Sequence, residues 1–126
     1  MIKNVLIVGL GGALGSMARY LCQKWFTSHY PGHFPWGTFT VNMIGCLLIG
    51  IFWGMSFRSF ASMETWKLFL MTGICGGFTT FSAFTLEGVG LWREERIGLF
   101  FLYLGGSVIL GLVATYAGVR LSRSFG

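Results

Sequence analysis

Four long apolar segments follow one another along the chain, and short stretches rich in polar and charged residues separate them. The segments cover about residues 5–21, 38–57, 66–92 and 97–121. Each has roughly the 20 residues that an α-helix needs to cross the hydrocarbon core of a bilayer. The pattern predicts a single all-α integral membrane domain, residues 1–126, with four transmembrane helices.

The third segment carries two adjacent glycines, Gly76 and Gly77, near its middle. Glycine is a poor helix former, so the pair predicts a break in this helix. Backbone groups released by a break find no partners in lipid, so they are tolerated only where they are buried, line a cavity or bind an ion. The following residues, 78–84, contain three hydroxyls and three phenyl rings. The stretch therefore predicts an ion site inside the membrane.

Composition supports the membrane assignment. Of the 126 residues, 54% are hydrophobic and 10% are charged, whereas soluble domains average about 25% charged. No nucleophile, base and oxyanion set can be assembled from such spans, so we do not expect an enzyme. The net charge of +5 is spread thinly along the loops. This favours contact with membrane lipid and argues against nucleic acid as a partner.

Small residues predict close contacts between helices. Gly11 and Gly15 in the first segment, and Gly73 and Gly77 in the third, have the four-residue spacing that lets another helix approach closely. The three cysteines lie in separate apolar segments without a Cys-x-x-Cys pair, which argues against a disulfide framework or a zinc site. We interpret them as small side chains at helix contacts.

Two polar side chains each permit two interpretations. Arg19, near the end of the first segment, either extends to the lipid headgroups or lines the mouth of an anion path. Asn42 needs a hydrogen-bond partner in hydrocarbon, which is either another helix or a permeating ion. Helical spacing places on one face of the second segment Thr38, Asn42, Gly45, Cys46 and Ile49.

The apolar segments hold neutral groups that suit an anion. Helical periodicity places Phe81, Phe84, Thr80 and Glu87 on one arc, and the edges of phenyl rings attract anions. The hydroxyl of Ser107 either bonds a carbonyl of its own helix or faces a pore. Donors are present at Asn42, Thr80, Ser82, Thr85, Tyr103 and Ser107. Such a path would bind an anion firmly enough to enter and loosely enough to leave.

The basic residues indicate almost no preferred orientation. Four spans put both termini on one side of the membrane. That side carries five of the nine Lys and Arg residues (Lys3, Arg58, Lys67, Arg120 and Arg123) and the other carries four (Arg19, Lys24, Arg93 and Arg96). A chain without a positive-inside bias can insert both ways. We therefore expect an antiparallel, dual-topology homodimer, in which two crossing breaks could jointly hold a cation.

Two motifs resemble those of the Fluc/CrcB family of fluoride channels. One is Gly76-Gly77-Phe78-Thr79-Thr80-Phe81-Ser82-Ala83-Phe84, followed by Glu87, and the other is Gly37-Thr38-Phe39-Thr40-Val41-Asn42. The resemblance spans the whole chain and implies a passive channel of the bacterial inner membrane. Such a channel releases fluoride that entered as hydrogen fluoride and so protects the cell from fluoride toxicity. Ala83 is a departure, because many members have threonine there.

The resemblance also implies roles for individual residues. It places Asn42, Phe81, Phe84, Thr80 and Ser82 along the fluoride pore, to which we add the donors Tyr103 and Ser107. It places Glu87 at the vestibule and favours the same place for Arg19. The backbone carbonyls of Gly76 and Thr79 would hold a central, structural sodium ion.

Two other functions remain as alternatives. A proton-coupled exporter of organic cations needs a membrane-embedded carboxylate, but the first segment has none and Glu87 comes late in the third. A subunit that only assembles other proteins would explain the glycine pairs. It would not explain Asn42 or the arc of rings and hydroxyls.

Overall fold

The computed structural model describes residues 1–56 and 64–124. These residues form helices α1 (Ile2–His29), α2 (Trp36–Met55), α3 (Glu64–Lys67), the π-helix η1 (Leu68–Cys75), α4 (Gly76–Phe78), α5 (Ser82–Arg93) and α6 (Ile97–Ser124). No strand occurs within the described part. Four helical stretches, 2–29, 36–55, 64–93 and 97–124, are long and apolar enough to cross a membrane, which confirms the predicted fold class at this level.

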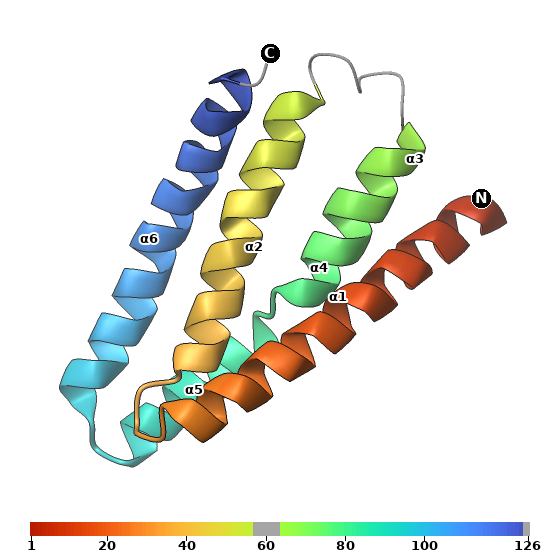
Figure 1. The fold of residues 1–126 in the computed structure, drawn as a ribbon. Coiled ribbons are helices and arrows are strands. Elements are labelled where there is room, and N and C mark those ends of the chain that lie inside the picture. Colours follow the sequence, from red (N-terminus) through yellow and green to blue (C-terminus); the bar gives the residue numbers. More distant parts are fainter. Residues whose placement is uncertain (57–63, 125–126) are drawn as a thin grey trace.

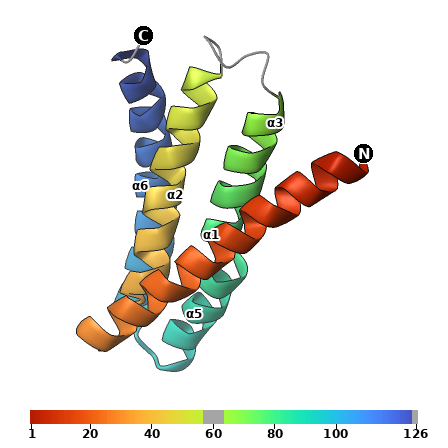
Figure 2. The same cartoon turned by 45° about the vertical axis from the view of Figure 1, so that its right-hand side comes forward.

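The helices form one elongated bundle in which α2 and α6 lie side by side (Figure 1). Helix α1 crosses the bundle obliquely beside η1 and α4, and α5 continues the third stretch towards the opposite end (Figure 2). Both termini lie towards one end of the bundle. The connections from α1 to α2 and from α5 to α6 lie at the other end (Figure 1).

Helix α1 is longer than the predicted span of residues 5–21. It continues to His29, into the stretch that we expected to be a loop, because no helix-breaking residue occurs before Pro31-Gly32. The hydroxyls of Thr27 and Ser28 bond the carbonyls four residues earlier (2.8 and 3.1 Å), which keeps these polar residues compatible with a helix. Phe57, at the end of the predicted second span, and the loop residue Arg58 lie outside the described residues.

The predicted break exists, but it follows the glycine pair instead of coinciding with it. Gly76 has helical angles (φ −62°, ψ −38°), whereas Thr79 is extended (φ −86°, ψ 159°) and the next helix begins at Ser82. The expectation that Gly76-Gly77 interrupts the helix through poor helix propensity is therefore wrong in position. The interruption occurs where a side chain of α2 competes for the backbone.

The glycines instead allow α1 to pack on η1 and α4. A Cβ built on Gly11 would lie 2.6 Å from the Phe69 carbonyl oxygen, and one on Gly77 would lie 2.5 Å from the Gly12 carbonyl oxygen. Gly73 likewise faces the Gly11 Cα at 2.9 Å. Because the atoms in contact are backbone, no side chain can move aside. The two predicted glycine pairs meet each other, and this contact joins the first and third stretches.

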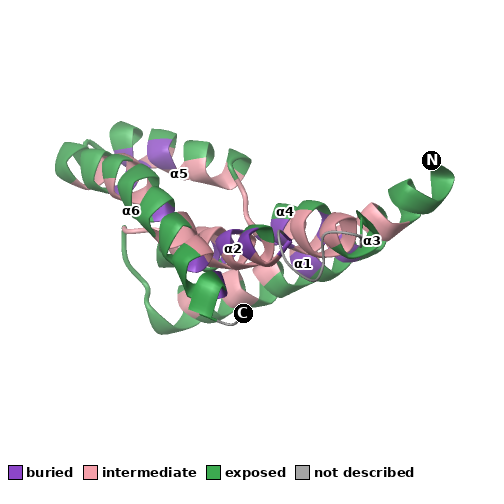
Figure 3. Cartoon of the chain, turned by 90° about the horizontal axis from the view of Figure 1, so that it is seen from above, coloured by how far each residue is buried: buried purple, intermediate pink, exposed green. Residues whose placement is uncertain are grey.

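Small residues also join α2 to α6. A Cβ on Gly50 would collide with the Thr115 carbonyl, and one on Gly118 would collide with the Leu47 carbonyl. The bundle has few fully buried large side chains, among which are Val41 and Tyr103. Much of the remaining apolar surface faces outwards (Figure 3). Close backbone packing, with apolar side chains directed to lipid or to another protein, is typical of membrane bundles.

Candidate ion site

One carboxamide of α2 holds the interrupted segment. Asn42 Nδ2 donates to the Thr80 carbonyl oxygen (3.1 Å), and the Thr80 amide donates to Asn42 Oδ1 (2.8 Å). The backbone amide and the backbone carbonyl of Thr80 both have hydrogen-bond partners inside an apolar span as a result. Of the two interpretations of Asn42, the contact with another helix is present. The Thr80 contact uses only one of the two Nδ2 hydrogens, so a ligand can still take the other.

The same contacts remove the donors of two backbone carbonyls. In an uninterrupted α-helix the Thr80 amide would bond the Gly76 carbonyl, and the Ala83 amide would bond the Thr79 carbonyl. Here the Thr80 amide donates to Asn42, and the Ala83 amide donates to Thr80 Oγ1 (3.2 Å). The carbonyls of Gly76 and Thr79 thus lose their helical donors. These are the two positions at which the resemblance implies a sodium ion.

Arg19 also reaches the break. Its Nε donates to the Gly77 carbonyl oxygen (3.1 Å), where a cation complements the negative end of the preceding helix. Because α1 continues to His29, Arg19 lies well inside the helix and not near its end. Its guanidinium contacts the end of α4, next to the break.

A cavity of about 380 Å³ opens beside the break, between α2, the interrupted segment and α6. We call it the central cavity. Seven residues assigned to the pore or the sodium site from the sequence line it: Asn42, Gly76, Thr79, Thr80, Phe81, Phe84 and Ser107. Ser82 and Tyr103, also assigned to the pore, do not line it. The tertiary structure therefore brings together residues from the second, third and fourth apolar segments.

Ser107 is the unusual member of this group. Its Oγ is buried and has no hydrogen-bond partner among the described residues. Buried hydroxyls nearly always have a partner, and serines of membrane helices usually bond a carbonyl of the preceding turn. Ser107 makes no bond to a carbonyl of its own helix, and the residue lines the central cavity. Its hydroxyl is thus a hydrogen-bond donor that the described part of the fold leaves unused.

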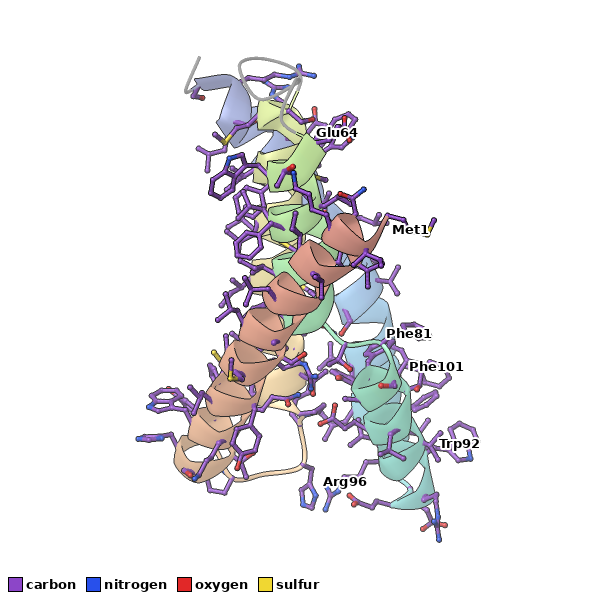
Figure 4. All side chains as sticks on the ribbon, turned by 90° about the vertical axis from the view of Figure 1, so that its right-hand side faces the viewer. Met1, Glu64, Phe81, Trp92, Arg96 and Phe101 are labelled. Carbon is purple, nitrogen blue, oxygen red and sulfur yellow. The ribbon has the colours of Figure 1, made fainter. Side chains whose placement is uncertain are left out.

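The two phenyl rings lie next to each other at the start of α5. Their centroids are 5.8 Å apart and their planes are inclined by 43°. Phe84 packs against the ring of Tyr103 (5.0 Å), whereas Phe81 is 75% exposed. Figure 4 shows Phe81 projecting from the same side of the molecule as Phe101 and Trp92. Thr80 Oγ1 lies 3.5 Å from Ser82 Oγ.

A second cavity, of about 580 Å³, lies between the α1–α2 connection and α5. We call it the outer cavity. Glu87 lines it and accepts a hydrogen bond from Tyr103 Oη (3.3 Å). Gln23 Nε2 donates to Thr38 Oγ1 (3.0 Å), and Thr38 lies beside both Glu87 and Tyr103. Arg19 is not among the described residues that line either cavity.

Sequence reasoning missed part of this polar cluster. Gln23 was assigned to a loop, and Thr38 was noted only for sharing a face with Asn42. Had the first helix been extended to Pro31, Gln23 would have fallen on the same end of the bundle as Thr38. Their pairing itself depends on how α1 crosses α2, which no local pattern records.

Comparison with known proteins extends along nearly the whole chain. The family described as CrcB-like protein, Camphor Resistance (CrcB), matches residues 6–119. The chain belongs to the CrcB family. This confirms the family suggested by the two motifs, and the match to CrcB covers all four membrane-spanning stretches and the break between α4 and α5.

Curated relatives agree with the CrcB assignment. A protein of Flavobacterium psychrophilum named fluoride-specific ion channel FluC is 43% identical over 97% of this chain and 98% of its own length. Proteins with the same name are 46% identical in Chlorobium luteolum, over 95% of this chain and 92% of the relative, and 40% identical in Agrobacterium fabrum, over 96% and 97%.

Proposed function

We propose that this CrcB family member is a passive, fluoride-selective channel that lowers cytoplasmic fluoride and so protects the cell from its toxicity. The observation that carries the proposal is the central cavity, which is lined by Ser107, Phe81 and Phe84 and in which the Ser107 hydroxyl has no partner among the described residues. Full-length relatives named as fluoride-specific ion channels support it. Their names describe channels, which agrees with the expectation that the chain is not an enzyme.

The central cavity supplies the chemistry that such a path needs. A small anion that leaves water requires donors to replace its hydration shell. Ser107 Oγ and the second Nδ2 hydrogen of Asn42 donate without an unfavourable fixed charge, and the edges of Phe81 and Phe84 add weak positive polarisation. Thr80 and Ser82 complete the path at the start of α5. None of these groups is cationic, so the anion is not trapped.

At the outer cavity we propose a vestibule that contains Glu87. Tyr103 acts there as a positioning residue, since its hydroxyl hydrogen is donated to Glu87 and its ring supports Phe84. Arg19 supports the break through the Gly77 carbonyl and does not meet the ion. These assignments refine the roles expected from the sequence.

We further propose that two copies pair as an antiparallel homodimer in the bacterial inner membrane. Gly76 supports this. It is helical and exposed, and a Cβ built on it would meet only the Met71 carbonyl oxygen, at 3.9 Å. Nothing within one chain therefore requires glycine at this position, whereas a second copy crossing closely would. The exposed Phe81 ring and the near balance of basic residues point the same way.

A structural sodium ion at the crossing of the two copies completes the proposal. The carbonyls of Gly76 and Thr79 fit a hard cation, because they are oxygen ligands that have lost their helical donors. The bound ion would offset the partial negative charge at the end of each interrupted helix. It would hold the copies together and would not be transported.

Fluoride efflux from proteoliposomes tests the function. Vesicles loaded with potassium fluoride, and matched vesicles loaded with potassium chloride, receive valinomycin to carry the counter-ion. We expect fast release of fluoride and no release of chloride. Release of neither ion from a folded, dimeric preparation would overturn the proposal. It would favour the exporter or the assembly subunit.

The two rings give a sharper test of the path. We expect Phe81→Ile and Phe84→Ile each to abolish fluoride efflux while the dimer stays intact, because isoleucine keeps apolar volume but has no polarised ring edge. Efflux is measured as above and assembly by size-exclusion chromatography. Val89→Ile, at an exposed position of the same helix that lines neither cavity, is the control and should leave efflux unchanged. Normal efflux in both ring variants would remove these residues from the path.

A further inference from the structure

Sulfur-containing side chains occupy one wall of the central cavity, and the proposed fluoride path gives them no role. Cys46 and Met43 come from α2, three residues apart and therefore on one helical face, and Cys75 is the last residue of η1. All three line the cavity. They are distinct from Cys22, which lies on α1 and lines neither cavity.

Contacts between α2 and η1 bring the two thiols to the same place. The methyl group of Thr79 packs against Gly45, next to Cys46, and the amide and hydroxyl of Thr79 bond the Cys75 carbonyl (3.1 and 2.9 Å). Cys46 and Cys75 both line the central cavity. Neither forms a disulfide.

The thioether of Met43 adds to the same region. The Met43 Cε and Cys46 Sγ both flank Gly111 of α6, at 3.6 and 3.5 Å from a Cβ built there. Thiols and thioethers are soft ligands that prefer soft metal ions over hard ones. No group of three or more His, Cys, Asp or Glu side chains that could hold a metal occurs among the described residues, so the two thiols are not part of a larger set of such ligands.

We propose that Cys46 and Cys75 form a binding site for a thiophilic divalent cation in the wall of the central cavity. Both thiols give up a proton to water, and two sulfur–metal bonds form, without any change of oxidation state. Two thiolates neutralise a divalent cation. The complex of two thiolates with one divalent cation has no net charge. An apolar cavity favours such a neutral complex, since burial of a net charge is strongly disfavoured. Each thiol can turn between staggered rotamers about its Cα–Cβ bond, which changes the distance between the two sulfurs.

Mercuric ion is the probe for this site. The background protein is Cys22→Ala, which removes the remote thiol. After incubation with Hg²⁺, excess glutathione removes metal held by one sulfur, while metal held by two sulfurs on one chain is retained. We expect about one retained Hg²⁺ per chain, in agreement with a two-thiol site. Further replacement by Cys46→Ala, or separately by Cys75→Ala, should abolish the retention.

The two replacements are independent, so a folding defect in one leaves the other as the test. The proposed two-thiol site would be contradicted if the folded Cys22→Ala/Cys46→Ala protein retained Hg²⁺. It would also be contradicted if the Cys22→Ala protein lost its Hg²⁺ to glutathione. The metal measurement needs no ion flux and so stands apart from the proposed function.

A second arm links the site to the proposed function, on which it rests. If the central cavity lies on the fluoride path, Hg²⁺ should block fluoride efflux of the Cys22→Ala protein, and a dithiol should restore it. Efflux of the folded Cys22→Ala/Cys46→Ala protein should be insensitive to Hg²⁺. Bound metal without any block would count against the fluoride path through this cavity, and not against the metal site.

Discussion

At the scale of single residues, the polar groups of the membrane-spanning helices differ in whether the protein itself satisfies them. The hydroxyl of Thr79 donates to Cys75, that of Tyr103 donates to Glu87, and Asn42 pairs with Thr80. Ser107 makes no such contact within the described residues. A group that the fold does not use is the one available to an ion.

Ser107→Ala separates these roles. Because no protein hydrogen bond is lost, we expect the melting temperature of the dimer to remain unchanged or to rise slightly. Fluoride efflux should fall by about tenfold or more, since a hydrogen bond to a charged partner contributes about 1.5–3 kcal/mol. Thermal unfolding in detergent and vesicle efflux provide the two readouts.

Ser28→Ala is the control for Ser107→Ala, because this exposed hydroxyl bonds only its own helix and is remote from the central cavity. It should alter neither measurement. A large loss of stability in Ser107→Ala would show that its hydroxyl has a structural partner after all.

At the scale of elements, the break between α4 and α5 depends on α2 more than on its own glycines. Gly76 is helical, and the chain leaves the helix only where Asn42 takes both backbone groups of Thr80. Helix propensity is a weak influence that tertiary contacts override. The break is therefore a property of two packed segments.

Asn42→Leu tests this dependence. Leucine keeps a similar volume but leaves the Thr80 amide and carbonyl without partners, at a cost of about 1–3 kcal/mol each. We expect lower thermal stability and faster hydrogen exchange of residues 79–83. Gln23→Leu also removes one side-chain hydrogen bond but lies away from the break, so exchange at 79–83 should stay slow. Equal exchange in the Asn42 variant and the unaltered protein would show that the break does not need Asn42.

Two neighbouring glycines of α1 offer a matched pair for the contact with η1. Gly11→Ala places a Cβ 2.6 Å from the Phe69 carbonyl oxygen, whereas a Cβ on Gly12 has no neighbour within 4 Å. We expect Gly11→Ala to destabilise the protein by about 1–3 kcal/mol through forced separation of the helices. Gly12→Ala should be neutral or slightly stabilising, because alanine favours a helix. Similar melting temperatures for both variants would rule out this close contact.

At the scale of the whole molecule, one chain leaves a large apolar surface and an exposed break uncovered. Phe81, Phe101 and Trp92 project from the same side (Figure 4). At Gly76, no contact within the chain requires glycine instead of a larger residue. Lipid can cover apolar side chains, but it cannot satisfy the carbonyls at a break. The second copy in the opposite orientation that we propose would meet both needs.

Charge-biased variants test the dual topology. Asn4→Lys with Ser124→Lys raises the count of basic residues on the terminal side from five to seven, against four on the other side. This double variant should insert in one orientation only. By itself it should therefore form no antiparallel dimer and show no fluoride efflux. Orientation is followed by protease accessibility of a tag at the C-terminus.

An opposite variant completes the test by complementation. Thr27→Lys and Ser28→Lys, combined with Lys3→Gln and Arg120→Gln, leave three basic residues on the terminal side and six on the other. Co-expression of the two oppositely biased proteins should restore both dimer and efflux. Full efflux from either variant alone would contradict the antiparallel arrangement.

The amino-acid sequence by itself determined the four membrane-spanning stretches and the glycine pairs, and, with the family resemblance, it named seven of the residues that line the central cavity. Hydropathy and the spacing of small or polar residues are local properties, so they can be read without knowing which helices meet. The glycine pairs of the first and third stretches were predicted to approach another helix, but not to meet each other.

Only the tertiary structure decided how individual polar groups are used. In the structure the break follows Gly76-Gly77, and Arg19 bonds the Gly77 carbonyl. The Ser107 hydroxyl has no partner among the described residues. The tertiary structure also extended α1 to His29 and so brought Gln23 to Thr38. The reason is physical. In a bundle held by backbone packing, the partner of each polar group depends on which segment crosses it and at what angle, and neither is written in the local pattern.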